Sequence, residues 1–151
     1  LQQQRFRAQI AAARELGKPL IIHTRNAKQD TLDILRAERA EEVGGVLHCF
    51  TEDLDMAMRA IELGFYISFS GIVTFKNAKE LQEVARSIPL ERILIETDSP
   101  FLAPQPVRGH INLPANVRYV AEFIAQLRNL DFAEVAQQTT QNYLRLFARN
   151  S

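Results

Sequence analysis

Short apolar runs alternate with amphipathic segments along the whole chain, and this alternation limits the possible folds more than any other feature. Four runs rich in Ile, Leu, Val and Phe have the length and composition of buried strands: residues 20–24, 44–50, 65–71 and 93–97. The runs are apolar on both faces, which is typical of strands in a parallel sheet covered by helices. Strand and helix in regular alternation therefore predict an α/β fold with a parallel sheet.

Apolar residues at helical spacing predict the helices between and after these strands. The predicted helices cover residues 5–16, 27–38, 51–64, 77–88, 114–124 and 131–147. We expect Gly17 to end the first helix, Thr51 to cap the third, and Asn77 with Glu80 to form a capping box at the fourth. The stripe that the last helix is predicted to bury contains Ala136, Thr140, Tyr143, Leu144 and Phe147.

A doubly wound sheet and a (β/α)₈ barrel both fit this order of elements. A complete barrel needs about 250 residues, whereas the chain has 151. If the fold is a barrel, four strands make it the C-terminal half (strands 5–8) of a (β/α)₈ TIM barrel, with residues 1–151 as one domain. The chain begins at Leu1 rather than at Met, so we expect it to be the later part of a longer protein.

Composition narrows the possible partners and the compartment. Eighteen basic residues balance eighteen acidic ones, so any nucleic acid must be held by local charges and not by a bulk positive field. The single Cys49 cannot form an intramolecular disulfide and agrees with a reducing, cytoplasmic location. No apolar run approaches the roughly 20 residues of a membrane span, so no membrane partner is predicted.

Candidate metal ligands lie near the ends of three of the four predicted strands. They are His23, His48 and Asp98, which are 25 and 50 residues apart (48 − 23 and 98 − 48). The carboxyl ends of parallel strands meet at one edge of a sheet, so these side chains should converge there. Taken singly, each has an ordinary structural explanation, such as a hydrogen-bonded histidine or a turn-forming aspartate. Together, imidazole and carboxylate predict a site for zinc, manganese, iron or a similar divalent ion.

Three further residues need a separate interpretation. Glu96 precedes Asp98 by two positions, which places both carboxylates on the same face of a strand. Cys49 follows His48 directly, but neighbouring strand residues point to opposite faces, so Cys49 is predicted to be a small buried core residue and not a catalytic partner. His110 lies in a loop without a second candidate ligand, and we expect it to be exposed.

Four segments together resemble consecutive motifs of one known family: PLIIHTRNA, GGVLHCFT, LGFYISFSGIVTFKNA and ILIETDSPFLAPQPVRG. The chain resembles the TatD family of metal-dependent deoxyribonucleases, and within it the YcfH-like bacterial branch. The resemblance implies an amidohydrolase-like TIM barrel whose strands five to eight are the four predicted here. It also implies that His23 and His48 bind metal from strands five and six. Asp98 would bind metal from strand eight and activate the attacking water.

The resemblance further implies a complete site with two divalent ions, such as Zn, Mg or Mn, and hydrolysis of a phosphodiester. DNA or another nucleic acid is the expected substrate, and the missing N-terminal half of the barrel is the other expected partner. We expect Glu96 to accept a hydrogen bond from one of the metal-binding histidines and thereby to orient its ring. Arg25, Ser99 and Arg108 are expected to contact substrate phosphates, although each is equally well explained as an ordinary surface residue.

Two departures from the family pattern limit these expectations. The family's His-x-His pair of strand one and its glutamate of strand four would precede Leu1, so the chain alone is expected to be weakly active or inactive. Leu113 stands where the family usually has glutamate. The same metal site would also suit deacylation of aminoacyl-tRNA or hydrolysis of another ester. A non-catalytic remnant of a barrel is a third possibility, against which the retention of His23, His48 and Asp98 argues.

Overall fold

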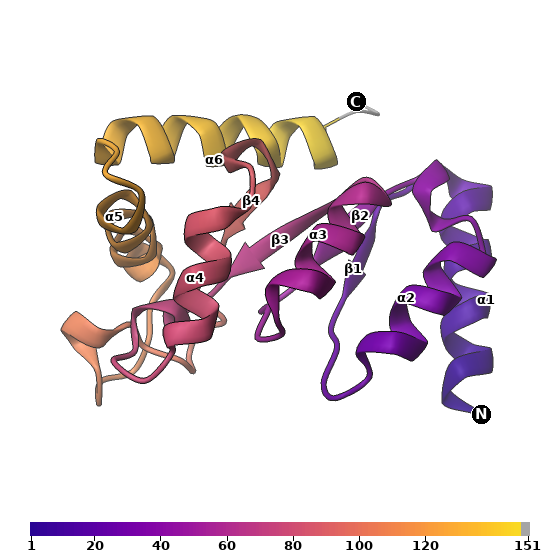
Figure 1. Ribbon diagram of the computed structural model, residues 1–151, viewed down its shortest axis with the longest axis horizontal. Coiled ribbons are helices and arrows are strands. Elements are labelled where there is room, and N and C mark those ends of the chain that lie inside the picture. Colours follow the sequence, from indigo (N-terminus) through magenta and orange to yellow (C-terminus); the bar gives the residue numbers. More distant parts are fainter. Residues whose placement is uncertain (149–151) are drawn as a thin grey trace.

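Four parallel strands form a single sheet in the computed structural model, which describes residues 1–148 (Figure 1). The strands are β1 (Leu20–Ile22), β2 (Gly45–Leu47), β3 (Phe65–Phe69) and β4 (Ile93–Ile95). They lie in the order β1-β2-β3-β4, and each neighbouring pair is parallel. The order in space equals the order in the sequence, which agrees with the predicted succession of βα units and gives the expected parallel α/β fold.

Helices connect the strands and follow the last one. They are α1 (Gln2–Leu16), α2 (Lys28–Ala37), α3 (Leu54–Glu62), α4 (Lys79–Ser87), α5 (Val117–Arg128) and α6 (Phe132–Phe147). Short 3₁₀ turns lie at Ala40–Glu42, Gly71–Thr74, Leu90–Arg92, Gln105–Val107 and Pro114–Asn116. Figure 1 shows α1 to α4 following one another along the sheet and α6 crossing the opposite side of β4. Within residues 1–148, none of the helices has the length and apolarity that a bilayer span needs.

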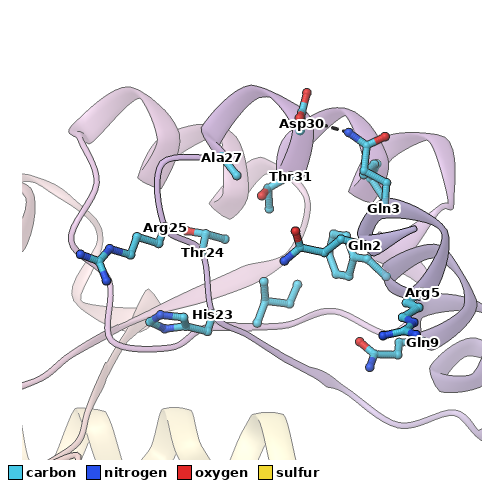
Figure 2. Close-up of a pocket in the computed structure, with 13 residues that line it drawn as sticks. Gln2, Gln3, Arg5, Gln9, His23, Thr24, Arg25, Ala27, Asp30 and Thr31 are labelled. Atoms are coloured by element: carbon cyan, nitrogen blue, oxygen red, sulfur yellow. Dashed lines mark hydrogen bonds between the residues drawn. The ribbon is translucent and has the colours of Figure 1, made fainter.

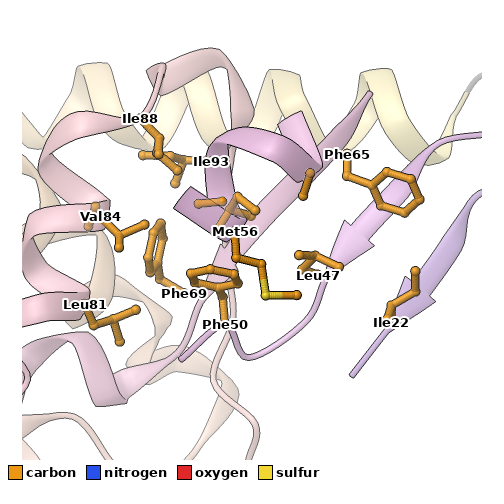
Figure 3. Close-up of a cluster of buried hydrophobic side chains, with 14 of the residues drawn as sticks. Ile22, Leu47, Phe50, Met56, Phe65, Phe69, Leu81, Val84, Ile88 and Ile93 are labelled. Carbon is orange, nitrogen blue, oxygen red and sulfur yellow. The ribbon is translucent and has the colours of Figure 1, made fainter. Parts of the chain in front are cut away.

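The main core lies between the sheet and helices α1 to α5. Phe65, Ile67 and Phe69 of β3 are completely buried in it, together with Met56 of α3 and Val84 of α4 (Figure 3). A smaller cluster lies on the other face of the sheet, where Val46, Tyr66 and Leu94 pack with Leu146 of α6. The sheet is therefore apolar on both faces, as the strand composition indicates.

Helix starts differ from two of the predictions. Helix α3 is capped by Asp53 and not by Thr51, because the Oδ1 atom of Asp53 accepts a 2.9 Å hydrogen bond from the Met56 N–H. No capping box forms at α4, which begins at Lys79 with Ala78 as its N-cap residue. The Gln82 amide instead holds the preceding turn by donating to the carbonyl oxygens of Val73 and Phe75. Gly17 does end α1, in the predicted left-handed conformation.

The predicted buried stripe of α6 is wrong. The helix buries Val135, Thr139, Asn142 and Leu146, whereas Tyr143 and Leu144 are 56% and 52% exposed. The apolar residues of this helix occupy more than one side, so periodicity alone cannot select the face. Asn142 selects it, since its side-chain amide donates to the Leu90 and Ile93 carbonyl oxygens at 2.9 and 2.8 Å.

Candidate metal centre

The candidate ligands lie just beyond the ends of the strands, because all four strands are shorter than the sequence suggests. Strands β1, β2 and β4 end at Ile22, Leu47 and Ile95, and the chain then continues into His23, His48 and Glu96. Two hydrogen bonds extend the pairing past these ends: His48 N–H donates to the Ile22 oxygen at 2.8 Å, and Glu96 N–H donates to the Phe69 oxygen at 3.0 Å. The carboxyl edge of the sheet therefore carries these side chains, as predicted.

Three potential metal ligands come together at this edge. One donor atom from each of His48, Glu96 and Asp98 lies within 4.8 Å of the others, and all three residues are partly buried. Nδ1 of His48 is 2.8 Å from Oε1 of Glu96, and Nε2 of His48 is 3.6 Å from Oδ1 of Asp98. An imidazole between two carboxylates is a donor set that suits zinc and similar divalent ions.

Left-handed backbone at two positions shapes this cluster. Cys49 has φ of 47° and Asp98 has φ of 57°, so the simple alternation of side chains along a strand ends before both. Aspartate is one of the few residues that adopt this conformation readily. The buried Asn112 holds the loop after Asp98 by donating to the Thr97 and Phe101 carbonyl oxygens, both at 2.8 Å. No motif in the sequence distinguishes Asn112 from other loop asparagines, so its role could not be predicted.

The two carboxylate oxygens of Glu96 have different surroundings. Its Oε2 atom accepts hydrogen bonds from the Cys49 N–H at 3.1 Å and from the Ser68 hydroxyl. Its buried Oε1 atom accepts no hydrogen bond of good geometry from the residues that the structure describes, and it lies 2.8 Å from His48 Nδ1. A buried carboxylate oxygen is costly unless a proton or cation compensates it, and a proton on His48 Nδ1 would do so. Nε2 of His48 and the Asp98 carboxylate then remain as donors that suit a divalent cation.

His23 stands apart from the cluster. Its ring centre is 5.8 Å from that of His48, and the residue is exposed. His23 lines a pocket of about 560 Å³ between α1 and the β1–α2 connection, together with Arg25 and the polar side chains of the first turns of α1 (Figure 2). His48 and Glu96 line a different pocket of about 460 Å³, over the sheet face that carries Ile21 and Val46.

The three predicted phosphate contacts have different surroundings. Arg25 is exposed beside His23 (Figure 2). The Ser99 hydroxyl donates to the Thr97 hydroxyl at 2.9 Å, on the loop that begins at Asp98. The guanidinium of Arg108 lies 3.6 Å from the centre of the Phe75 ring, so one face of the guanidinium makes a cation–π contact.

Two further predictions, that Cys49 is buried and that His110 is exposed, are confirmed. Cys49 is buried, and its Sγ atom contacts the Ser70 hydroxyl at 3.5 Å. Burial raises the pKa of the Cys49 thiol. His110 is exposed.

Comparisons with known sequences relate nearly the whole chain to one family. The family model described as TatD related DNase matches residues 1–148. The chain is 58% identical to the uncharacterized metal-dependent hydrolase YcfH of Escherichia coli K12, over 97% of the chain and 55% of that protein. It is 51% identical to the uncharacterized metal-dependent hydrolase YabD of Bacillus subtilis, over 99% of the chain and 59% of that protein. The chain thus spans little more than half the length of these relatives.

Solved structures of TatD proteins have a fold similar to that of this chain. The TatD homologue YJJV from Escherichia coli K12 superposes with a TM-score of 0.86 at 28% identity, over 94% of this chain and 54% of the other. A TatD family hydrolase from Entamoeba histolytica gives a TM-score of 0.84 at 18% identity, over 96% of this chain and 56% of the other, a likeness of fold alone. With the family model matching residues 1–148, the chain belongs to the TatD-related DNase family.

Proposed function

We propose that this chain is the C-terminal half of a (β/α)₈ barrel hydrolase that cleaves phosphodiester bonds of DNA with the help of divalent metal ions. The observation that carries the proposal is the convergence of His48, Glu96 and Asp98 at the carboxyl edge of a parallel sheet. Active sites of barrel enzymes lie at this edge. The relatives YcfH and YabD are described as metal-dependent hydrolases, which agrees with hydrolysis that depends on a metal.

The barrel part of the proposal rests on the sheet and on the lengths of the relatives. Strands β1 and β4 are the two edges of a sheet of four parallel strands, and the inward-facing Ile21 of β1 is 66% exposed. A solved relative has almost twice the length of this chain. Four further βα units would cover that exposed face and pair with both edges.

The metal ligands would be His23, His48 and Asp98, with Glu96 behind His48. His48 Nε2 and Asp98 Oδ1 already face each other at 3.6 Å, whereas the exposed His23 ring would turn toward them. A bound divalent ion, of which a complete site would hold two, neutralises charge on a phosphate and lowers the pKa of water. The remaining ligands of such a pair would come from the other half of the barrel.

Asp98 would also act as the general base. Its carboxylate accepts no side-chain hydrogen bond from residues 1–148, and His48 Nε2 is 3.6 Å from Oδ1, so an oxygen is available to accept a proton from the attacking water. Arg25, Ser99 and Arg108 would hold phosphate oxygens at the rim. Arg108 would have to keep its ring contact with Phe75 while it binds, because a guanidinium can stack and donate in its plane at once.

Hydrolysis of single-stranded DNA by the complete protein, with and without added Zn²⁺, Mg²⁺ or Mn²⁺, tests the proposal against the Asp98→Asn variant. Asparagine tolerates the left-handed backbone at position 98, so the fold should persist. We expect the rate to fall at least about 100-fold, as is usual for loss of a general base. Asp33→Asn, on the exposed face of α2, is the matched control. Activity of Asp98→Asn within twofold of the parent would exclude the role of Asp98.

Aminoacyl-tRNA is the second substrate to test, because deacylation would use the same ligands. Turnover of the ester without cleavage of DNA would replace the nuclease assignment but keep the metal site. No turnover of either substrate by the complete protein would favour the non-catalytic remnant.

A further inference from the structure

We infer that Ser68 and the backbone N–H of Cys49 position Glu96 so that its carboxylate imposes one tautomer on His48. In this tautomer the proton is on Nδ1, and Nε2 is free to bind a metal ion. Ser68 would then be a positioning residue on β3, the one strand whose end carries no candidate metal ligand. The inference deepens the proposed function, since metal binding by Nε2 belongs to that proposal.

The contacts cross three strands. Ser68 is on β3, Glu96 follows β4 and His48 follows β2. The Ser68 hydroxyl and the Cys49 N–H both donate to Oε2 of Glu96. With Oε2 held by two donors, the other oxygen, Oε1, is turned to within 2.8 Å of His48 Nδ1.

The chemistry of the groups selects the tautomer. A carboxylate can only accept hydrogen bonds, so an imidazole nitrogen next to it is stabilised when it carries a proton. In a neutral ring the proton on Nδ1 leaves a lone pair on Nε2. Oδ1 of Asp98 is farther from the ring, 3.6 Å from Nε2, so the nearer Glu96 decides which nitrogen carries the proton. A cation between Nε2 and Asp98 would then be bound by both acceptors.

Ser70 supplies a matched comparison two residues along the chain. Like Ser68 it is buried, at 1% against 4% exposure. Its hydroxyl, however, contacts the Cys49 thiol and accepts a hydrogen bond from the Ile72 N–H. Among the described residues, Ser70 makes no hydrogen bond with Glu96. Loss of either hydroxyl removes the same atom from the same region, but only Ser68 touches the carboxylate.

Replacement of Glu96 by glutamine gives the sharpest expectation. The Cys49 N–H can only donate, so the amide oxygen of Gln must occupy the position of Oε2. The amide NH₂ then faces Nδ1 of His48 and donates to it. The imidazole proton is thereby forced onto Nε2, the opposite tautomer, which cannot bind a metal without losing that proton.

The experiment is long-range ¹H–¹⁵N NMR of the imidazole rings in the metal-free protein, at about pH 8, where ordinary histidines are neutral. The chain has three histidines, and loss of signals in His48→Gln assigns those of His48. We expect a protonated Nδ1 in the parent and in Ser70→Ala, a protonated Nε2 in Glu96→Gln, and a mixture in Ser68→Ala. Ser68→Thr keeps the hydroxyl and should restore the parent tautomer.

Zinc titration of the same proteins is a second readout that does not require activity. We expect about 10-fold weaker binding in Ser68→Ala and in Glu96→Gln, the usual size for a residue that supports a ligand, and no change in Ser70→Ala. Parent-like tautomers in Ser68→Ala, or equal effects of both serine substitutions, would refute the inference. The predicted tautomers in a protein that hydrolyses no phosphodiester would support it and count only against the proposed nuclease activity.

Discussion

The Oδ1 atom of Asp98 lies 3.6 Å from Nε2 of His48, although the two residues are 50 positions apart and come from strands that do not pair (98 − 48 = 50). Strand β3 lies between β2 and β4 in the sheet, and the hydroxyl of its Ser68 donates to Glu96. A histidine and an aspartate that follow different strands therefore lie close enough for both to bind one cation.

The first prediction concerns this pair. His48→Ala and Asp98→Asn should each weaken zinc binding by about 100-fold or more, since a lost ligand costs more than the 10- to 100-fold typical of a supporting residue. His110→Ala is the control, because His110 is exposed in a loop. Calorimetric titration with Zn²⁺ measures all three. Equal zinc affinity in parent and His48→Ala would place the metal elsewhere.

The second prediction concerns the attachment of α6. Asn142 is fully buried and satisfies two backbone oxygens near the start of β4. Asn142→Ala should reduce the free energy of unfolding by about 2 kcal/mol, because it leaves buried acceptors without donors. Gln137→Ala, at an exposed position of the same helix, should change it by less than about 0.5 kcal/mol. Urea denaturation distinguishes the two, and similar midpoints would show that the amide contributes little.

A third prediction follows from the charges that join the starts of α2 and α3. Lys28 Nζ lies 2.9 Å from Asp53 and 2.8 Å from Asp55. The backbone N–H of Met56, followed by Lys28, lowers the pKa of the Asp53 carboxyl. A carboxyl whose pKa is lower in the folded state stabilises the fold above its unfolded pKa and loses that effect as the pH falls through the folded pKa.

Asp53→Asn keeps the helix cap and removes the charge. The parent should therefore be slightly more stable than Asp53→Asn at pH 7, by about 0.5 kcal/mol for such an exposed pair. The difference should begin to shrink as the pH falls below about 4 and vanish once the pH is below the folded pKa of Asp53. Asp131→Asn is the control, since Asp131 is an N-cap residue without a side-chain cap bond. Thermal unfolding as a function of pH measures both, and a difference that grows in acid would contradict the assignment.

The fourth prediction tests how closely the loop after Asp98 is packed. A Cβ atom at Gly71 would come within 2.2 Å of the Leu102 carbonyl oxygen, in the same loop as Asp98. Gly71→Ala should destabilise the fold by about 1–3 kcal/mol through overpacking and weaken zinc binding by moving this loop. Gly17→Ala strains a left-handed helix end far from the site, where an added Cβ would meet no other heavy atom within 4 Å. It should cost about 1 kcal/mol and leave zinc affinity unchanged, so an equal loss of affinity in both variants would point to general destabilisation.

Much of the fold could be predicted from the sequence, because its evidence is local. The apolar runs and the helical stripes determine the order of strands and helices, and a run that is apolar on both faces requires a covered parallel sheet. The same reasoning places His23, His48 and Asp98 at one edge, with Glu96 on the same face as Asp98, since strand ends in a parallel sheet coincide. The motif resemblance to the family, carried by residues in sequence, is confirmed over residues 1–148.

Tertiary structure decided which residues meet. Glu96, rather than His23, joins His48 and Asp98 in the cluster, because the Ser68 hydroxyl and the Cys49 N–H hold its carboxylate beside His48. The buried face of α6 was likewise selected by the Asn142 amide and not by helical periodicity. Periodicity reports which side of an element is apolar, whereas these outcomes depend on hydrogen bonds between segments far apart in the chain. The sequence by itself therefore determined the scaffold and the edge of the sheet, and only the three-dimensional packing decided the partners of His48.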